Sequence, residues 1–86
     1  MSSFYTYVLQ SKTDGRFYTG FTSNLENRLK EHNSGKVNST KFRIPLQIVY
    51  FEFCSNIDDA IHREKYLKST YGKRYIRNRL KHYLDD

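Results

Sequence analysis

FYTYVLQ (4–10), the turn SKTDG (11–15) and RFYTGF (16–21) decide the fold of this chain. Both runs are aromatic and β-branched, and the segment between them ends in an Asp-Gly step, a pattern that predicts a β-hairpin. Because side chains alternate along a strand, Tyr7 and Tyr18 each belong to one defined face. We expect the hairpin register to make these two tyrosines neighbours.

A helix is expected directly after the hairpin. Ser23-Asn24-Leu25-Glu26 has the Ser-x-x-Glu form of a capping box, and Gly35 can take the left-handed conformation that ends a helix. Arg28 and His32 then lie on the margin of the buried side of this helix. Residues 33–45 form a connection longer than the usual four to six residues, which predicts a binding loop.

The second half of the chain adds one strand and two helices. Leu46–Phe53 is the most apolar segment and predicts a third strand at the centre of the sheet. A helix should begin at Ser55 or Asn56, and Gly72 should separate it from a third helix over 73–84. We therefore predict a single α/β domain over residues 1–86, with a three-stranded, mainly antiparallel sheet flanked by about three helices.

Composition narrows the class of partner. The chain has 86 residues and a formal net charge of +6, which favours a polyanion such as nucleic acid or an anionic membrane surface. The sequence has no apolar run near the roughly 18 to 20 residues of a membrane span and no pattern of a signal peptide. A single cysteine, Cys54, excludes an internal disulfide and a cysteine-based zinc cluster. We expect a cytoplasmic protein that does not bind membranes.

Three residues could carry phosphate chemistry. The Arg28 guanidinium can donate two hydrogen bonds to a phosphate, although a surface salt bridge with Glu31 or Glu26 is the commoner role of an isolated arginine. Glu64 falls on the buried side of its helix, where a carboxylate requires a cationic partner or a metal. One carboxylate with open water positions suits Mg²⁺ or Mn²⁺. His32 has a second interpretation as a half-buried polar residue.

The tyrosines have a structural and a chemical interpretation. Tyr7 and Tyr18 can simply fill the core, which is the commonest use of aromatic residues on strands. Alternatively, a phenol whose pKa is lowered by a metal or by Arg28 accepts a proton from attacking water while the other phenol orients that water.

Taken in order, these residues resemble the GIY-YIG nuclease family from Tyr5 to about Leu80. Tyr5-Thr6-Tyr7 stands at the first motif and Tyr18-Thr19-Gly20 at the second, with Tyr5 in place of the usual glycine. The chain is most similar to small stand-alone bacterial members, which resemble the N-terminal nuclease domain of excinuclease C.

The resemblance implies a metal-dependent DNA endonuclease, with a role in DNA repair. Glu64 would hold one divalent metal, Mg²⁺ or Mn²⁺, and Arg28 would polarise the phosphate. Tyr7, Tyr18 and His32 would position or deprotonate the attacking water. Basic residues expected to contact the nucleic-acid backbone are Lys36, Lys41, Arg43, Lys68, Lys73 and Arg74.

Two other functions fit the same composition. A DNA- or RNA-binding module could keep the fold without cutting, since basic charge and exposed aromatic residues suit it equally well. A structural adaptor could dimerise through the third helix. We expect a monomer or weak homodimer, and substrate choice could also depend on a targeting partner protein.

Overall fold

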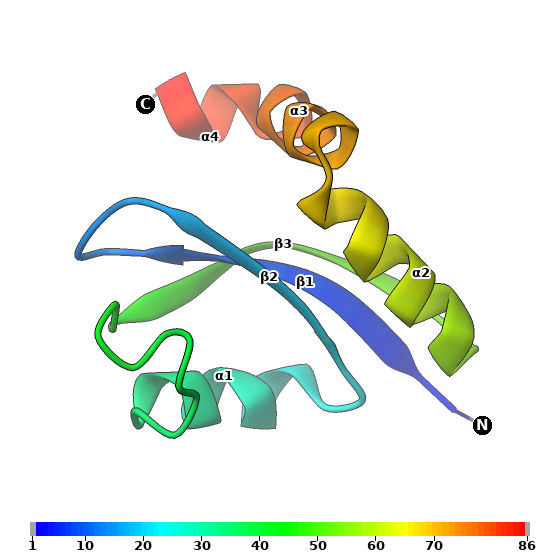
Figure 1. The fold of residues 1–86 in the computed structure, drawn as a ribbon, viewed down its shortest axis with the longest axis horizontal. Coiled ribbons are helices and arrows are strands. Elements are labelled where there is room, and N and C mark those ends of the chain that lie inside the picture. The colour runs from blue at the N-terminus through cyan, green and yellow to red at the C-terminus, as the bar shows by residue number, and fades with distance from the viewer. Residues whose placement is uncertain (1, 86) are drawn as a thin grey trace.

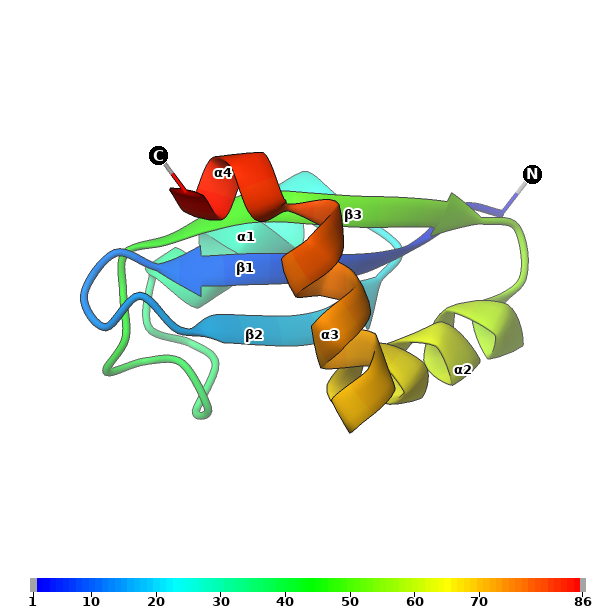
Figure 2. The same cartoon turned by 90° about the horizontal axis from the view of Figure 1, so that it is seen from above.

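The computed structural model describes residues 2–85 as a sheet between two layers of helices (Figure 1). The sheet is antiparallel throughout, in the order β2 (Phe17–Thr22), β1 (Phe4–Ser11), β3 (Leu46–Cys54). One face carries α1 (Leu25–Asn33), and the other carries α2 (Ile57–Lys68), α3 (Thr70–Arg79) and α4 (Lys81–Asp85). Seen from above, α3 crosses over the sheet (Figure 2). The predicted hairpin and α/β class are confirmed, with four helices in the described part of the chain.

The central strand is β1, so the prediction that Leu46–Phe53 occupies the centre is wrong. Residues 6–9 of β1 are each 2% exposed or less, because alternate side chains face α1 and the α2–α3 layer. In β3, by contrast, Phe51 and Phe53 are 52% and 55% exposed. The apolar character of β3 thus reflects aromatic residues on the surface of an edge strand.

Two predicted helix boundaries are corrected. Asn24, one residue later than Ser23, caps α1, because its side chain accepts from the Asn27 amide at 3.0 Å. Gly35 has the expected positive φ of 76° just after the helix. Gly72 does not separate two helices; Ser69 does, and α3 begins at Thr70.

Gly72 instead allows the first turn of α3 to approach the end of α2. A Cβ at this position would lie 2.0 Å from the backbone oxygen of Tyr66. The glycine therefore reflects a close contact between helices, which a sequence pattern alone cannot distinguish from a helix break.

The core has one cluster on each side of the sheet. Tyr7, Leu9 and Leu46 pack beneath α1, and Val8, Leu67 and Ile76 pack beneath the other helices. Thr6 Oγ1 also donates to the Ala60 carbonyl at 3.0 Å and ties α2 to β1. None of the helices in residues 2–85 has the length and apolar character required to cross a bilayer.

Candidate active site

The hairpin register brings Tyr7 and Tyr18 together as predicted. Tyr7 lies directly opposite Gly20, so Tyr18, two residues earlier on β2, is its diagonal neighbour on the same face. A Cβ on Gly20 would lie 2.6 Å from Tyr7 Oη. The Tyr7 ring can therefore lie over β2 only because Gly20 has no side chain.

Behind Tyr7 lies a buried polar chain. Tyr7 Oη is 3.0 Å from His32 Nε2, and His32 Nδ1 is 2.7 Å from Thr40 Oγ1. Both His32 and Thr40 are fully buried, and the Tyr18 ring meets the imidazole edge-on at 5.1 Å between centroids. Burial and, to a smaller extent, the Arg28 charge lower the pKa of His32 to about 4. The imidazole is therefore neutral at pH 7.

The hydrogen-bond partners favour one direction of donation from Tyr7 through His32 to Thr40. Burial raises the pKa of Tyr7, outweighing the opposing effect of Arg28, so the phenol keeps its proton and can donate it to His32 Nε2. His32 Nδ1 then donates to Thr40 Oγ1, and the Thr40 hydroxyl points to the Val37 carbonyl at 3.5 Å. The expected lowering of a phenol pKa by Arg28 is thus reversed at Tyr7 by desolvation.

Arg28 projects from α1 at the edge of the hydrogen-bonded series formed by Tyr7, His32 and Thr40. Its Nη1 donates to Glu31 Oε1 at 3.1 Å, and its side chain is 35% exposed. Interaction with the Tyr7 phenol is the largest cause that raises the pKa of Arg28. The salt bridge considered from sequence is therefore present, and the guanidinium still lies beside the phenol.

Glu64 reaches the site from α2, on the far side of the sheet. Its side chain is 17% exposed, and Oε2 lies 3.1 Å from Lys68 Nζ, so the predicted buried-side carboxylate has a lysine partner. The Glu64 charge is the smallest of the effects that raise the pKa of Tyr7.

The donor set around Glu64 fits a hard, water-rich cation. Within residues 2–85 there is no group of three or more His, Cys, Asp or Glu side chains that could hold a metal. A lone carboxylate leaves positions for water and substrate oxygens, the coordination that Mg²⁺ and Mn²⁺ prefer, whereas zinc requires more protein ligands.

Residues 3–83 match the GIY-YIG catalytic domain. The chain belongs to the GIY-YIG family. A UPF0213 protein of Clostridium perfringens is 48% identical over 65 residues, covering 74% of this chain and 69% of that protein. One from Bacillus licheniformis is 39% identical over 88 residues and covers 98% and 90%. The solution structure of a UPF0213 protein from Bacillus halodurans has a TM-score of 0.53 at 32% identity and covers 86% and 81%. Family membership indicates a nuclease.

Tyr5, which replaces the glycine of the first GIY-YIG motif, belongs to an aromatic cluster on the β3 side. Its ring meets Phe51 and Phe53 edge-on, with centroids 6.0 and 5.9 Å away. The substitution thus adds aromatic surface next to β3, whereas Gly20 lies on β2, the strand on the other side of β1.

The basic residues predicted to bind nucleic acid fall into two groups. Arg43 is committed to the fold, because its Nε donates to Asp14 Oδ2 at 3.0 Å and its Nη2 to the Phe17 carbonyl at 3.3 Å. The others lie on the loop after α1 or on the α2–α3 side and keep exposed charges: Lys36, Lys41, Lys68, Lys73 and Arg74.

Thr40 and Asn33 were not identified from the sequence. Asn33 closes the loop by accepting from the Leu46 amide at 2.7 Å and donating to the Leu46 carbonyl at 2.9 Å. This closure brings Thr40 behind His32. A threonine in a polar loop carries no pattern that separates it from its neighbours, so the long connection predicted as a binding loop has a structural role as well.

Proposed function

We propose that the protein is an endonuclease that hydrolyses phosphodiester bonds of DNA with a divalent metal. The observation that carries this proposal is the set of groups around Tyr7. Tyr18 is the diagonal neighbour of Tyr7 on β2, and His32 accepts from the Tyr7 phenol at 3.0 Å. Burial is the largest influence on the pKa of this phenol, followed by Arg28 and, more weakly, by Tyr18 and Glu64. A guanidinium, a phenol and a carboxylate can hold a phosphate, a water and a cation.

Arg28 is the phosphate-binding group in this proposal. Its guanidinium donates to the non-bridging oxygens and stabilises the negative charge that grows as water attacks. The buried chain of Tyr7, His32 and Thr40 lies behind it, and Glu31 restrains it on the helix surface. Tyr7 is 1% exposed, so it acts as a positioning residue.

Tyr18 is the phenol assigned to the attacking water, because its side chain is only partly buried at the edge strand. It orients the water and accepts its proton as the new bond to phosphorus forms, while the phenolic proton of Tyr18 passes to solvent. The bond between phosphorus and the oxygen opposite the attacking atom then breaks, and solvent protonates the leaving oxygen.

Glu64 would hold Mg²⁺ or Mn²⁺ beside the phosphate, with Lys68 as its partner when no cation is bound. The ion would supply a Lewis acid that neutralises charge on the phosphate oxygens.

A nucleic-acid-binding module without activity is the second candidate. The Glu64–Lys68 ion pair favours it, since that pair satisfies the carboxylate without a metal. The exposed rings of Phe51 and Phe53 also suit contact with unpaired bases.

Cleavage of supercoiled plasmid, branched DNA and single-stranded DNA in Mg²⁺ or Mn²⁺ separates the two candidates. We expect cutting by the wild type, loss of cutting in Glu64→Gln, and a loss of about 10²–10³-fold in Arg28→Ala, as for other groups that stabilise transition-state charge. Asp58→Asn is the matched control, because Asp58 is an exposed carboxylate at the start of the same helix. Binding without any cutting would support the non-catalytic module.

A further inference from the structure

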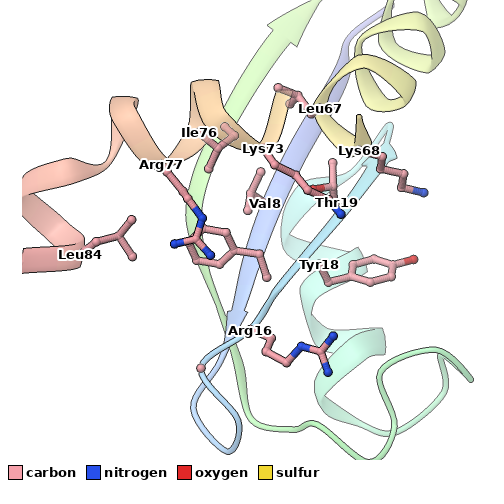
Figure 3. A pocket seen from close by; sticks show the side chains of 12 residues that line it. Val8, Arg16, Tyr18, Thr19, Leu67, Lys68, Lys73, Ile76, Arg77 and Leu84 are labelled. Carbon is pink, nitrogen blue, oxygen red and sulfur yellow. The ribbon is translucent and has the colours of Figure 1, made fainter. Parts of the chain in front are cut away.

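A pocket of about 460 Å³ opens between β2 and α3, on the face of the sheet opposite to α1. We call it the β2–α3 pocket. Residues of the hairpin turn and β2 form one wall, the end of α2 and α3 form the other, and Leu84 of α4 closes one end (Figure 3).

In the part of the chain that the structure describes, the charged residues that line the β2–α3 pocket are all cationic. They are Arg16, Lys68, Lys73 and Arg77. Lys68 pairs with Glu64, whereas no carboxylate among residues 2–85 lines the pocket to balance the other three cations. Lys73 and Arg77 are also four residues apart on α3, a spacing at which like charges repel. An anion between these side chains would relieve that repulsion.

The floor of the pocket is apolar. Val8, Leu67 and Ile76 are 1%, 2% and 3% exposed, and Phe17 packs against them. A space with cations at its rim and an apolar floor fits a ligand with a phosphate and a flat hydrophobic part. Its volume lies in the usual range of small-molecule sites, about 300–1,000 Å³, which accommodates one nucleotide.

We propose that the β2–α3 pocket binds one unpaired nucleotide of the strand that is cut. The phosphate lies between Lys73 and Arg77, and the base lies against the half-buried side chains of Phe17 and Leu84, which cover the buried floor. A base inside a duplex has both faces stacked and cannot make this contact, so the pocket selects DNA with unpaired nucleotides beside the scissile bond. This inference rests on the proposed nuclease function.

Two residues connect the pocket to the candidate active site. Tyr18 borders the pocket at its place on β2, while its ring points away from the pocket and packs against His32 (Figure 3). Lys68 lines the pocket and also pairs with Glu64. A strand that crosses β2, the edge strand, can therefore lie in both places at once. The pocket thus holds a nucleotide that flanks the scissile phosphate.

Binding measured in EDTA tests the pocket separately from cleavage. The probe is a fluorescent single-stranded oligonucleotide, compared with its duplex, with an abasic strand of the same length and with a free deoxynucleoside monophosphate. We expect the abasic strand to bind at least about fivefold more weakly, the lower limit for loss of one stacked base. The duplex and the free nucleotide should also bind more weakly than the single strand.

Two variants localise the effect. Arg77→Gln should weaken binding of the single strand and reduce the slope of log affinity against log salt by about one. Arg79→Gln, an identical change of charge on the same helix outside the pocket, should have a smaller effect. Thr19→Tyr fills the pocket without changing charge and should abolish the preference for the base-bearing strand over the abasic strand.

Four results would each overturn the proposal. Arg77→Gln and Arg79→Gln could weaken binding equally, or the abasic strand could bind as tightly as the base-bearing strand. A free nucleotide could bind as tightly as the single strand, or a polyglutamate peptide could compete for the protein as well as the single strand does. If the wild type cuts DNA but one of these results is found, the pocket assignment fails alone. If it cuts nothing and the binding results hold, the nuclease function fails and the pocket remains.

Discussion

Gly20→Ala tests the geometry on which the candidate site depends. The added Cβ would lie 2.6 Å from Tyr7 Oη and 2.8 Å from its Cζ, where an ordinary contact begins at about 3.4 Å. The Tyr7 ring must therefore move, although it is 1% exposed and hydrogen-bonded to His32. Overpacking a core costs about 1–3 kcal/mol, and a buried polar group left without a partner costs about 1–3 kcal/mol.

We expect Gly20→Ala to lower the free energy of unfolding by about 2–6 kcal/mol. At about 4–8 °C per kcal/mol, the melting temperature should fall by at least about 8 °C. Circular dichroism gives the melting temperature, and the ¹⁵N shifts of the His32 ring report on its bond to Tyr7. Gly15→Ala, at a turn with no atom within 4 Å of the added Cβ, should leave the His32 shifts unchanged. In a Tyr7→Phe background the penalty should be smaller, since the closest atom is gone. An unchanged melting temperature, or the same penalty in both backgrounds, would refute the reasoning.

Three further predictions concern titration, helix packing and charge. The pKa of His32 is about 4 when folded and about 6.5 when unfolded, so the unfolded state takes up the proton first. The free energy of unfolding should therefore fall by on the order of 3 kcal/mol as the pH drops from 6.5 to 4. In His32→Gln, the urea midpoint should lack the part of its pH dependence that comes from this histidine. Gly72→Ala should cost at least about 3 kcal/mol in chemical denaturation, because its Cβ would meet the Tyr66 carbonyl at 2.0 Å; a wild-type midpoint would contradict the assigned helix contact. Arg43→Gln should lower the melting temperature with no change in DNA affinity, whereas Lys73→Gln should weaken DNA binding. Weaker DNA binding by Arg43→Gln at an unchanged melting temperature would contradict the structural role of Arg43.

The parts of the fold that follow local rules were predictable. The hairpin, the helix beginning at Asn56 and the end of α1 near Gly35 each depend on a few adjacent residues, and all are found. The same rules predicted that Tyr7 and Tyr18 share a face, because side-chain alternation and a short turn determine it.

The position of β3 depends on which strand is covered on both faces, and that is a property of the whole sheet. Hydrophobicity favoured Leu46–Phe53 as the centre, whereas β1 has helices on both sides and β3 exposes Phe51 and Phe53. Gly72 is a similar case, since the contact that requires it comes from α2.

Within the site, the residue types were predictable and their partners were not. Arg28, His32 and Glu64 could be selected from spacing and resemblance, but Thr40 and Lys68 complete their hydrogen bonds and ion pairs. The pKa of Tyr7 shows the same limit. Its sign depends on burial exceeding the effect of a nearby arginine, which no sequence pattern reports.

The most direct test of the central claim is to measure binding and cleavage together in Glu64→Gln. A nuclease whose metal is held by Glu64 should lose Mn²⁺-dependent cutting in this variant, while its affinity for DNA in EDTA stays near that of the wild type. Cutting by Glu64→Gln at the wild-type rate would contradict the account, as would a wild type that binds DNA and never cuts it.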